Sequence, residues 1–271
     1  MKKVVSVALF LAVLFSLGGL SNLGSALAEG GGGVGYDMLT YDYEPDQSVA
    51  VRIQYPYFGG SDYDQVNQMV NDAVQGYVNS YLEYFDKGTT LTIDYQCAVT
   101  LQNSQMISMV FWGYSDLSEA MHPNNDFYTL NIDLATMSEV TLNDLYAVDA
   151  DFEVVYYAKA QYPADPITCG AYDESSFQEI LQSIQDDASY DQFTDSSESI
   201  PAYFTPDGVV LSLYVSHADG DHFEAQLSYA DIQQFALTNQ GQGQNQGQNQ
   251  NQGQNQGQSQ NQAQSQDDWG E

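Results

Sequence analysis

The stretch Leu91-Thr92-Ile93-Asp94-Tyr95-Gln96-Cys97-Ala98-Val99-Thr100-Leu101 places an apolar residue at every second position. This alternation predicts a β-strand with one buried face. Asn103-Ser104 then reads as a turn, and residues 106–114 return as a second apolar-rich strand. Two such runs joined by a short polar turn predict a β-hairpin. A sheet is therefore the expected framework of the fold.

A strand and a long helix are predicted before this hairpin. Residues 49–55 alternate in the same way, and the strand is expected to stop at Pro56, which lacks the N–H that a sheet ladder uses. Ser61–Asp64 offers candidate helix caps. The apolar residues that follow recur every three or four positions as far as Phe85, and Gly88 is the expected helix end.

The rest of the foldable chain mixes short strands and helices. We predict a strand over 127–134, a short strand over 140–146 that runs into a helical turn, helices over 151–162 and 176–186, paired strands over 209–215 and 223–229, and a closing helix over 230–237. Ser176 and Glu179 form a candidate capping box for the second of these helices. Meander strands with segregated helices predict an α+β fold, built as an antiparallel sheet with packed helices.

The chain divides by composition into segments. Residues 1–28 combine Lys2-Lys3, a short apolar run and an Ala-Leu-Ala site, so they predict a secretory signal peptide and extracellular release, with no membrane attachment after its removal. We expect a Gly-rich spacer over 29–40, a strand–helix–strand subdomain over 41–102, and a larger domain over 103–238. Residues 239–271 repeat Gln with Gly and Asn, and predict a disordered tail that is a solvated spacer or an assembly segment.

Acidic residues dominate the charge of the chain. The sequence has 37 Asp+Glu against 5 Lys+Arg, a formal net charge of −32. Nucleic acids and anionic lipid surfaces are excluded as partners, because binding them requires basic side chains. Such a charge instead favours encounter with cationic partners. The oligomeric state does not follow from the sequence.

Two motif groups resemble a known family. Met121-His122-Pro123, a strand, Asp133 and a turn, and then residues 141–146 form the first group; residues 204–229 form the second. Together they resemble the extracellular domain of the RsiV-like family, which is found in lysozyme-sensing anti-sigma factors and in some peptidoglycan deacetylases. The resemblance spans about residues 45–235 and implies a smaller domain followed by a larger one, with lysozyme as the ligand class. It does not extend to the transmembrane and sigma-binding parts of those proteins.

The most suggestive string for chemistry is His217-Ala218-Asp219-Gly220-Asp221-His222, which approximates the H-x-H-x-D-H metal nest of binuclear hydrolases. Asp219 replaces a histidine ligand, so a polar turn with Gly220 at positive φ is the favoured interpretation. His122 lies in a second polar loop. We therefore predict a binding surface, with no catalytic residue, metal or cofactor, built from these two loops: His122, Asn124, Asp126, His217, Asp219, Asp221 and His222.

Two other acidic groups have calcium-like spacings, Asp149-x-Asp151-x-Glu153 and Asp219-x-Asp221-x-x-Glu224. Neither has the glycine and terminal glutamate of a calcium loop, so solvated surface is favoured. Cys97 and Cys169, the only thiols, could form a disulfide in an exported protein, or Cys97 could be a buried small apolar residue. The sequence leaves both possibilities open.

The sequence predicts a secreted, non-enzymatic binding module for a cationic protein or a cell-wall component. Two alternatives remain at this point. One is a cell-wall hydrolase that uses His122 with a carboxylate. The other is a matrix component that assembles through the Gln-rich tail.

Overall fold

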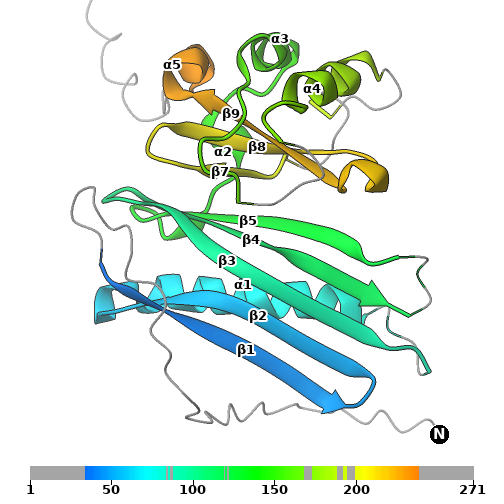
Figure 1. The fold of residues 1–271 in the computed structure, drawn as a ribbon. Helices are drawn as coiled ribbons and strands as arrows, with labels where there is room; N and C mark the ends of the chain where they lie inside the picture. Colours follow the sequence, from blue (N-terminus) through cyan, green and yellow to red (C-terminus); the bar gives the residue numbers. More distant parts are fainter. Residues whose placement is uncertain are drawn as a thin grey trace, which may run out of the picture. The chain divides into compact units, whose positions relative to one another are not determined.

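Two sheets and their helices make up the part of the chain that the structure describes (Figure 1). The structure is a computed structural model, and it describes residues 34–83, 85, 88–118, 120, 122–167, 173–187, 192–193 and 199–237. The predicted signal peptide and the Gln-rich tail lie outside these residues. The strands and helices belong to one compact unit, and they occur in separate groups along the sequence. This arrangement confirms the α+β class.

The larger sheet has six strands in the order β1-β2-β3-β4-β5-β6. Their bounds are β1 Tyr36–Asp46, β2 Val49–Phe58, β3 Leu91–Gln102, β4 Met106–Leu117, β5 Asn124–Asp133 and β6 Ser138–Glu139. The β3–β4 hairpin confirms the prediction from residues 91–114. The predicted boundary between residues 102 and 103 lies at the tip of this hairpin, within the sheet.

The sheet is mixed rather than wholly antiparallel, which corrects the prediction. β2 and β3 pair in parallel, whereas the other neighbours pair antiparallel. Helix α1 (Asp64–Leu82) follows β2 and carries the chain back to the end where β2 began. A strand that follows such a crossover must run parallel to the first strand.

Helix α1 lies along one face of the large sheet (Figure 1). A turn of 3₁₀ helix, η1 (Ser61–Tyr63), precedes it. The period of three to four residues is confirmed, because Val66, Val70, Val74 and Val78 are all buried. The helix ends at Leu82 rather than near Gly88, and no side-chain cap forms at its start. Instead, Asn67 in its first turn exchanges hydrogen bonds with the backbone N–H and C=O of Phe58, at 2.8 and 2.9 Å.

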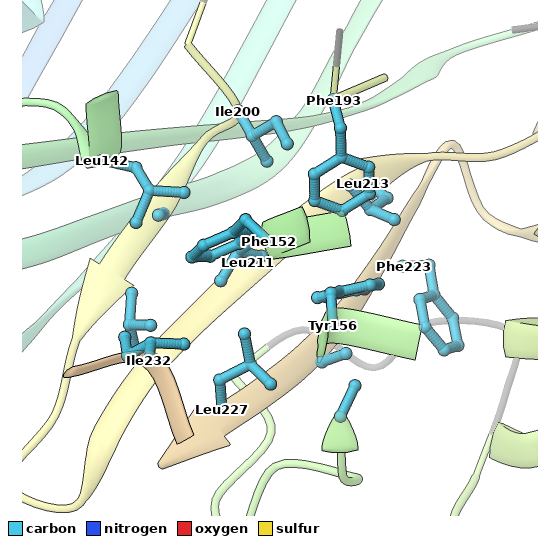
Figure 2. Close-up of a cluster of buried hydrophobic side chains, with 14 of the residues drawn as sticks. Leu142, Phe152, Tyr156, Phe193, Ile200, Leu211, Leu213, Phe223, Leu227 and Ile232 are labelled. Atoms are coloured by element: carbon cyan, nitrogen blue, oxygen red, sulfur yellow. The ribbon is translucent and has the colours of Figure 1, made fainter. Parts of the chain in front are cut away.

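The smaller sheet has three strands, β7 (Ala202–Phe204), β8 (Gly208–Tyr214) and β9 (His222–Ser228). The predicted helices are confirmed as α3 (Ala150–Lys159) and α4 (Phe177–Asp186), and the closing helix is α5 (Tyr229–Ile232) followed by η3 (Gln233–Phe235). Figure 1 shows α3, α4 and α5 on one side of this sheet. Figure 2 shows the core between them, in which Phe152 and Tyr156 of α3 meet Leu211, Leu213 and Phe223.

The two sheets are joined by a series of buried hydrogen bonds. Ser108 of β4 donates its hydroxyl to Asn131 of β5 at 2.7 Å, and Asn131 donates to the carbonyl of Ala202 at 2.9 Å. The backbone N–H of Phe204 completes the series by donating a hydrogen bond to the Ser108 hydroxyl at 2.8 Å. Since these three hydrogen bonds are all buried, they hold β7 against β4 and β5 on the face of the large sheet opposite α1.

Several predicted elements differ in the structure. β1 was not predicted, and it begins within the range 29–40 that was expected to be spacer. β2 continues through Pro56, which stands opposite Met38 of β1. The short strand expected over 140–146 is not observed, because β6 covers only Ser138–Glu139. The helical turn expected with it does form, as α2 (Leu142–Leu145), where Thr141 and Asp144 make a capping box. The box expected at Ser176 is absent from α4; the Ser176 hydroxyl contacts Asp173 instead.

Within the described residues, no helix is both long and apolar enough to cross a bilayer.

Candidate functional site

The two polar loops singled out in the sequence meet in the structure. Asn125, at the start of β5, donates from its backbone N–H and its side-chain amide to one carboxylate oxygen of Asp221, at 2.9 and 3.1 Å. The rings of His122 and His217 stack with their centroids 3.5 Å apart and their planes 10° apart. We call residues 122–125 and 217–221 together the paired-loop surface.

The second loop holds its shape through local backbone geometry. It connects β8 to β9 through η2 (His217–Asp219) and then turns at Gly220, whose φ is 104°. The prediction of a polar turn with Gly220 at positive φ is confirmed. Asp221 also has a positive φ, 70°, which is uncommon for a residue with a side chain. The hydrogen bonds that the Asp221 carboxylate accepts from Asn125 offset this strain.

Asp221 and His217 form a hydrogen-bonded pair at the centre of the surface. Nδ1 of His217 lies 3.0 Å from the Asp221 carboxylate. Burial raises the pKa of Asp221, but the hydrogen bonds from Asn125 and His217, together with the charge of His217, outweigh it and leave this pKa lowered. Asp221 is therefore ionised at neutral pH and holds the imidazole of His217 in place. His217 and His122 remain exposed to solvent.

The other predicted site residues are placed differently. Asn124 is exposed at the first position of β5, and Asp219 accepts a hydrogen bond from the Ser216 hydroxyl at 2.6 Å. His222 is buried in β9, where its ring lies 4.9 Å from that of Phe127, and burial lowers its pKa. The structure therefore separates His222 from the exposed histidine pair.

Asp126 belongs to a tyrosine network on the other side of β5, because neighbouring residues of a strand point to opposite faces. Its two carboxylate oxygens accept hydrogen bonds from Tyr81 and Tyr95, both at 2.8 Å. The Ser115 hydroxyl donates to that of Tyr81 at 2.7 Å. Burial raises the pKa of Asp126, against the opposing effect of these hydrogen bonds. Asp126 therefore braces β5 behind the paired-loop surface and does not lie on it.

Among the described residues, no three His, Cys, Asp or Glu side chains converge closely enough to hold a metal ion. The two acidic spacings have structural explanations. Asp149 caps α3 by accepting from the backbone N–H groups of Asp151 and Phe152, each at 3.0 Å. Glu224 is fully buried in β9, where it accepts a hydrogen bond from the Tyr203 hydroxyl at 2.9 Å. Its carboxylate therefore lies in the interior of the protein, whereas Asp219 is exposed to solvent.

Cys97 is a buried free thiol on the α1 side of β3, and burial raises its pKa. This agrees with the interpretation of Cys97 as a small apolar core residue. Cys169, the other half of the possible disulfide, lies outside the described residues.

Asn125 and the two tyrosines of the Asp126 network were not singled out from the sequence. Tyr81 and Tyr95 stand 45 and 31 positions from Asp126 in the chain, so no local pattern connects them. Asn125 lay inside a loop that had been chosen for its polarity. Only its position next to the predicted Asn124 and Asp126 could have drawn attention to it.

Comparisons with known proteins give a limited set of similarities. No protein-family model matches the sequence, and no curated protein matches it. Its structural neighbours are DUF3298 family proteins. One, from Pseudomonas aeruginosa PAO1, has a TM-score of 0.47 at 14% identity, over 76% of this chain and 95% of that chain. Another, from Bacteroides fragilis NCTC 9343, has a TM-score of 0.47 at 13% identity, over 76% of this chain and 94% of that chain.

Proposed function

We propose that this protein is a secreted, non-enzymatic binding module that recognises a cationic protein through the paired-loop surface. The observation that supports this most directly is the joining of the two loops by Asn125 and Asp221. This contact presents exposed imidazole, amide and carboxylate groups as one preorganised surface. A preorganised surface loses less conformational freedom when it binds.

The charge of the protein indicates the kind of partner. Arg52 and Lys159 are the only Lys or Arg residues in the described part of the chain, and Arg52 pairs with Asp42 at 3.3 Å. Asp219 and Asp221 therefore belong to a chain in which acidic side chains far outnumber basic ones. A field of one sign accelerates encounter with a partner of the opposite sign and repels acidic competitors. The resemblance to lysozyme-sensing proteins supports a basic lysozyme as the ligand class.

The test is binding to an immobilised basic lysozyme at about 50 mM and about 300 mM NaCl, because exposed charge pairs weaken strongly over this range. We expect binding at the lower salt concentration, and weaker binding, with a higher Kd, at the higher salt concentration. No binding at either concentration would overturn the proposal. Binding to insoluble peptidoglycan but not to lysozyme would assign the surface to a cell-wall ligand instead.

A matched pair of variants separates the paired-loop surface from general acidity. Asn124→Lys adds a positive charge at the surface, and Asn79→Lys adds the same charge at an exposed position of α1. We expect Asn124→Lys to weaken lysozyme binding about fivefold to tenfold, which corresponds to about 1–1.4 kcal/mol. Equal effects of the two variants would show that only the net charge matters.

One observation favours a second candidate function, a hydrolase. The contact of His217 Nδ1 with Asp221 is the arrangement that orients an imidazole as a general base. His122, stacked on that ring, would then face the substrate. If turnover of a cell-wall glycan or peptide is detected, the His122→Ala and His217→Ala variants should abolish it. Turnover that both variants leave unchanged would dismiss this candidate.

A further inference from the structure

A pocket of about 500 Å³ lies apart from the paired-loop surface. Helix α1, β5, the segment 139–142 and the segment 199–202 line it. This volume falls within the range of about 300–1,000 Å³ that is typical of small-molecule sites. Neither of the loops of the paired-loop surface contributes to its lining, so it requires a separate explanation.

The wall of the pocket combines aromatic rings with a carboxylate. Tyr77 of α1 and Tyr128 of β5 stack with their ring centroids 4.4 Å apart, and Phe111 supports Tyr77 from the side at 5.4 Å. Burial raises the pKa of Tyr77, and the nearby charge of Glu139 raises it further, so this phenol is neutral. The aromatic wall is therefore uncharged.

Glu139 supplies the negative charge of the pocket. The residue as a whole is exposed, yet partial burial raises the pKa of its carboxyl group, and the neighbouring Asp144 raises it further. Neither Arg52 nor Lys159, the described Lys and Arg residues, lines the pocket. Negative charge beside an aromatic wall, without a basic side chain in the lining, is complementary to a cation.

We propose that this pocket binds a small organic cation, such as a guanidinium or primary ammonium group on a short apolar stem. The cationic head pairs with the Glu139 carboxylate, and the stem packs against Tyr77 and Tyr128. A positive charge beside Glu139 compensates the partial burial of its carboxylate and offsets the repulsion from Asp144. The proposal is independent of the proposed function, because the groups that it uses lie outside the paired-loop surface.

Calorimetric titration with butylguanidinium, butylammonium and the neutral isostere butylurea tests the charge requirement. We expect one or both cations to bind, and butylurea to bind at least about tenfold more weakly, which is the loss that corresponds to about 1.4 kcal/mol. The two cations distinguish a guanidinium site from an ammonium site. Equal binding of all three compounds, or no binding of either cation, would overturn the proposal.

Three variants locate the binding. Glu139→Gln removes the pairing charge, and Glu179→Gln removes the same charge from an exposed position of α4. Gly76→Phe fills the pocket, since Gly76 lines it and a Cβ built there meets no atom within 4 Å. We expect the first and third variants to lose cation binding about tenfold or more and Glu179→Gln to retain it. Retention by both Glu139→Gln and Gly76→Phe would contradict the proposal.

The same variants keep the two proposals distinguishable. Lysozyme binding should survive in Gly76→Phe, because the paired-loop surface is intact there. Loss of lysozyme binding together with cation binding would assign both activities to this pocket. Circular dichroism and thermal unfolding of each variant confirm that it is folded before binding is measured.

Discussion

Gly113 in β4 illustrates how a single residue limits the fold. A Cβ placed on this glycine would stand 1.9 Å from the carbonyl oxygen of Asp94 and 2.9 Å from the Cα of Tyr95, both on the neighbouring strand β3. Backbone atoms cannot yield as a flexible side chain can, so Gly113→Ala must push β3 and β4 apart. We expect this variant to lower the free energy of unfolding by about 3 kcal/mol or more, measured by urea denaturation.

The control for that substitution is Gly76→Ala in α1. A Cβ at Gly76 meets no atom within 4 Å, and alanine favours a helix over glycine by about 0.5–1 kcal/mol. Gly76→Ala should therefore leave stability unchanged or raise it. A similar loss in both variants would mean that the approach of β3 and β4 is not what Gly113 protects.

His222 makes stability depend on pH in a defined direction. Burial lowers its pKa from the ordinary value of 6.5, and the nearby Asp221 only partly opposes this. Below pH 6.5 the unfolded chain binds a proton that the folded chain does not, so the free energy of unfolding falls as the pH falls. We expect urea midpoints measured between about pH 7 and about pH 5 to decline for this reason.

The His222→Gln variant isolates this effect, because glutamine does not titrate. Its stability at neutral pH can be lower than that of the parent chain, but its slope of stability against pH should be shallower. Carboxylates such as Asp126 contribute equally to both proteins and cancel in the comparison. Parallel slopes would show that His222 has no part in the acid sensitivity.

The residues of the candidate site were only partly predictable from the sequence. His122 and His217 were found because both lie in polar loops beside apolar strands. Their stacking was not predictable, since it depends on how β7, β8 and β9 pack against β4 and β5. Asp126 and His222 were placed on the binding surface because of their loop neighbours. The structure moves them away from it, because Asp126 points to the opposite face of β5 and His222 is already part of β9.

At the scale of elements, Asn67 joins the end of β2 to the start of α1. Its side chain satisfies both backbone groups of Phe58, which is itself fully buried. Asn67→Ala leaves this N–H and C=O without those partners, and partly buried polar groups without partners cost about 1–3 kcal/mol. We expect a loss of this size in the free energy of unfolding, measured by thermal or urea unfolding.

Asn71→Ala is the matched control for this substitution. It makes the same chemical change one turn further along α1, at an exposed position. Because alanine is the stronger helix former, the control should be neutral or slightly stabilising. If the two variants were equally stable, the helix would be anchored by its valines alone, and the Phe58 contact would carry no weight.

Elements with a strong apolar period were predicted well. The β3–β4 hairpin, α1 and the β8–β9 pair each bury a regular set of side chains that the alternation or the helical spacing reveals. β1 escaped notice because most of it is exposed at the sheet edge, and β7 because it has only three residues, all buried. The parallel pairing of β2 with β3 could not be predicted from local pattern, since it depends on the path of α1 across the sheet.

At the scale of the whole molecule, charge opposes compactness. With a formal net charge of −32, the folded chain brings like charges closer together than the unfolded chain does. Raising NaCl from about 10 mM to about 100 mM shortens the screening length from about 30 Å to about 10 Å. We therefore expect the urea midpoint at neutral pH to rise with salt, in contrast to lysozyme binding, which salt should weaken. Near pH 4.1, the isoelectric point of the sequence, repulsion largely disappears and so should the salt effect. Stability that rises equally with salt at both pH values would point to a general solvent effect rather than to relief of repulsion between the carboxylates.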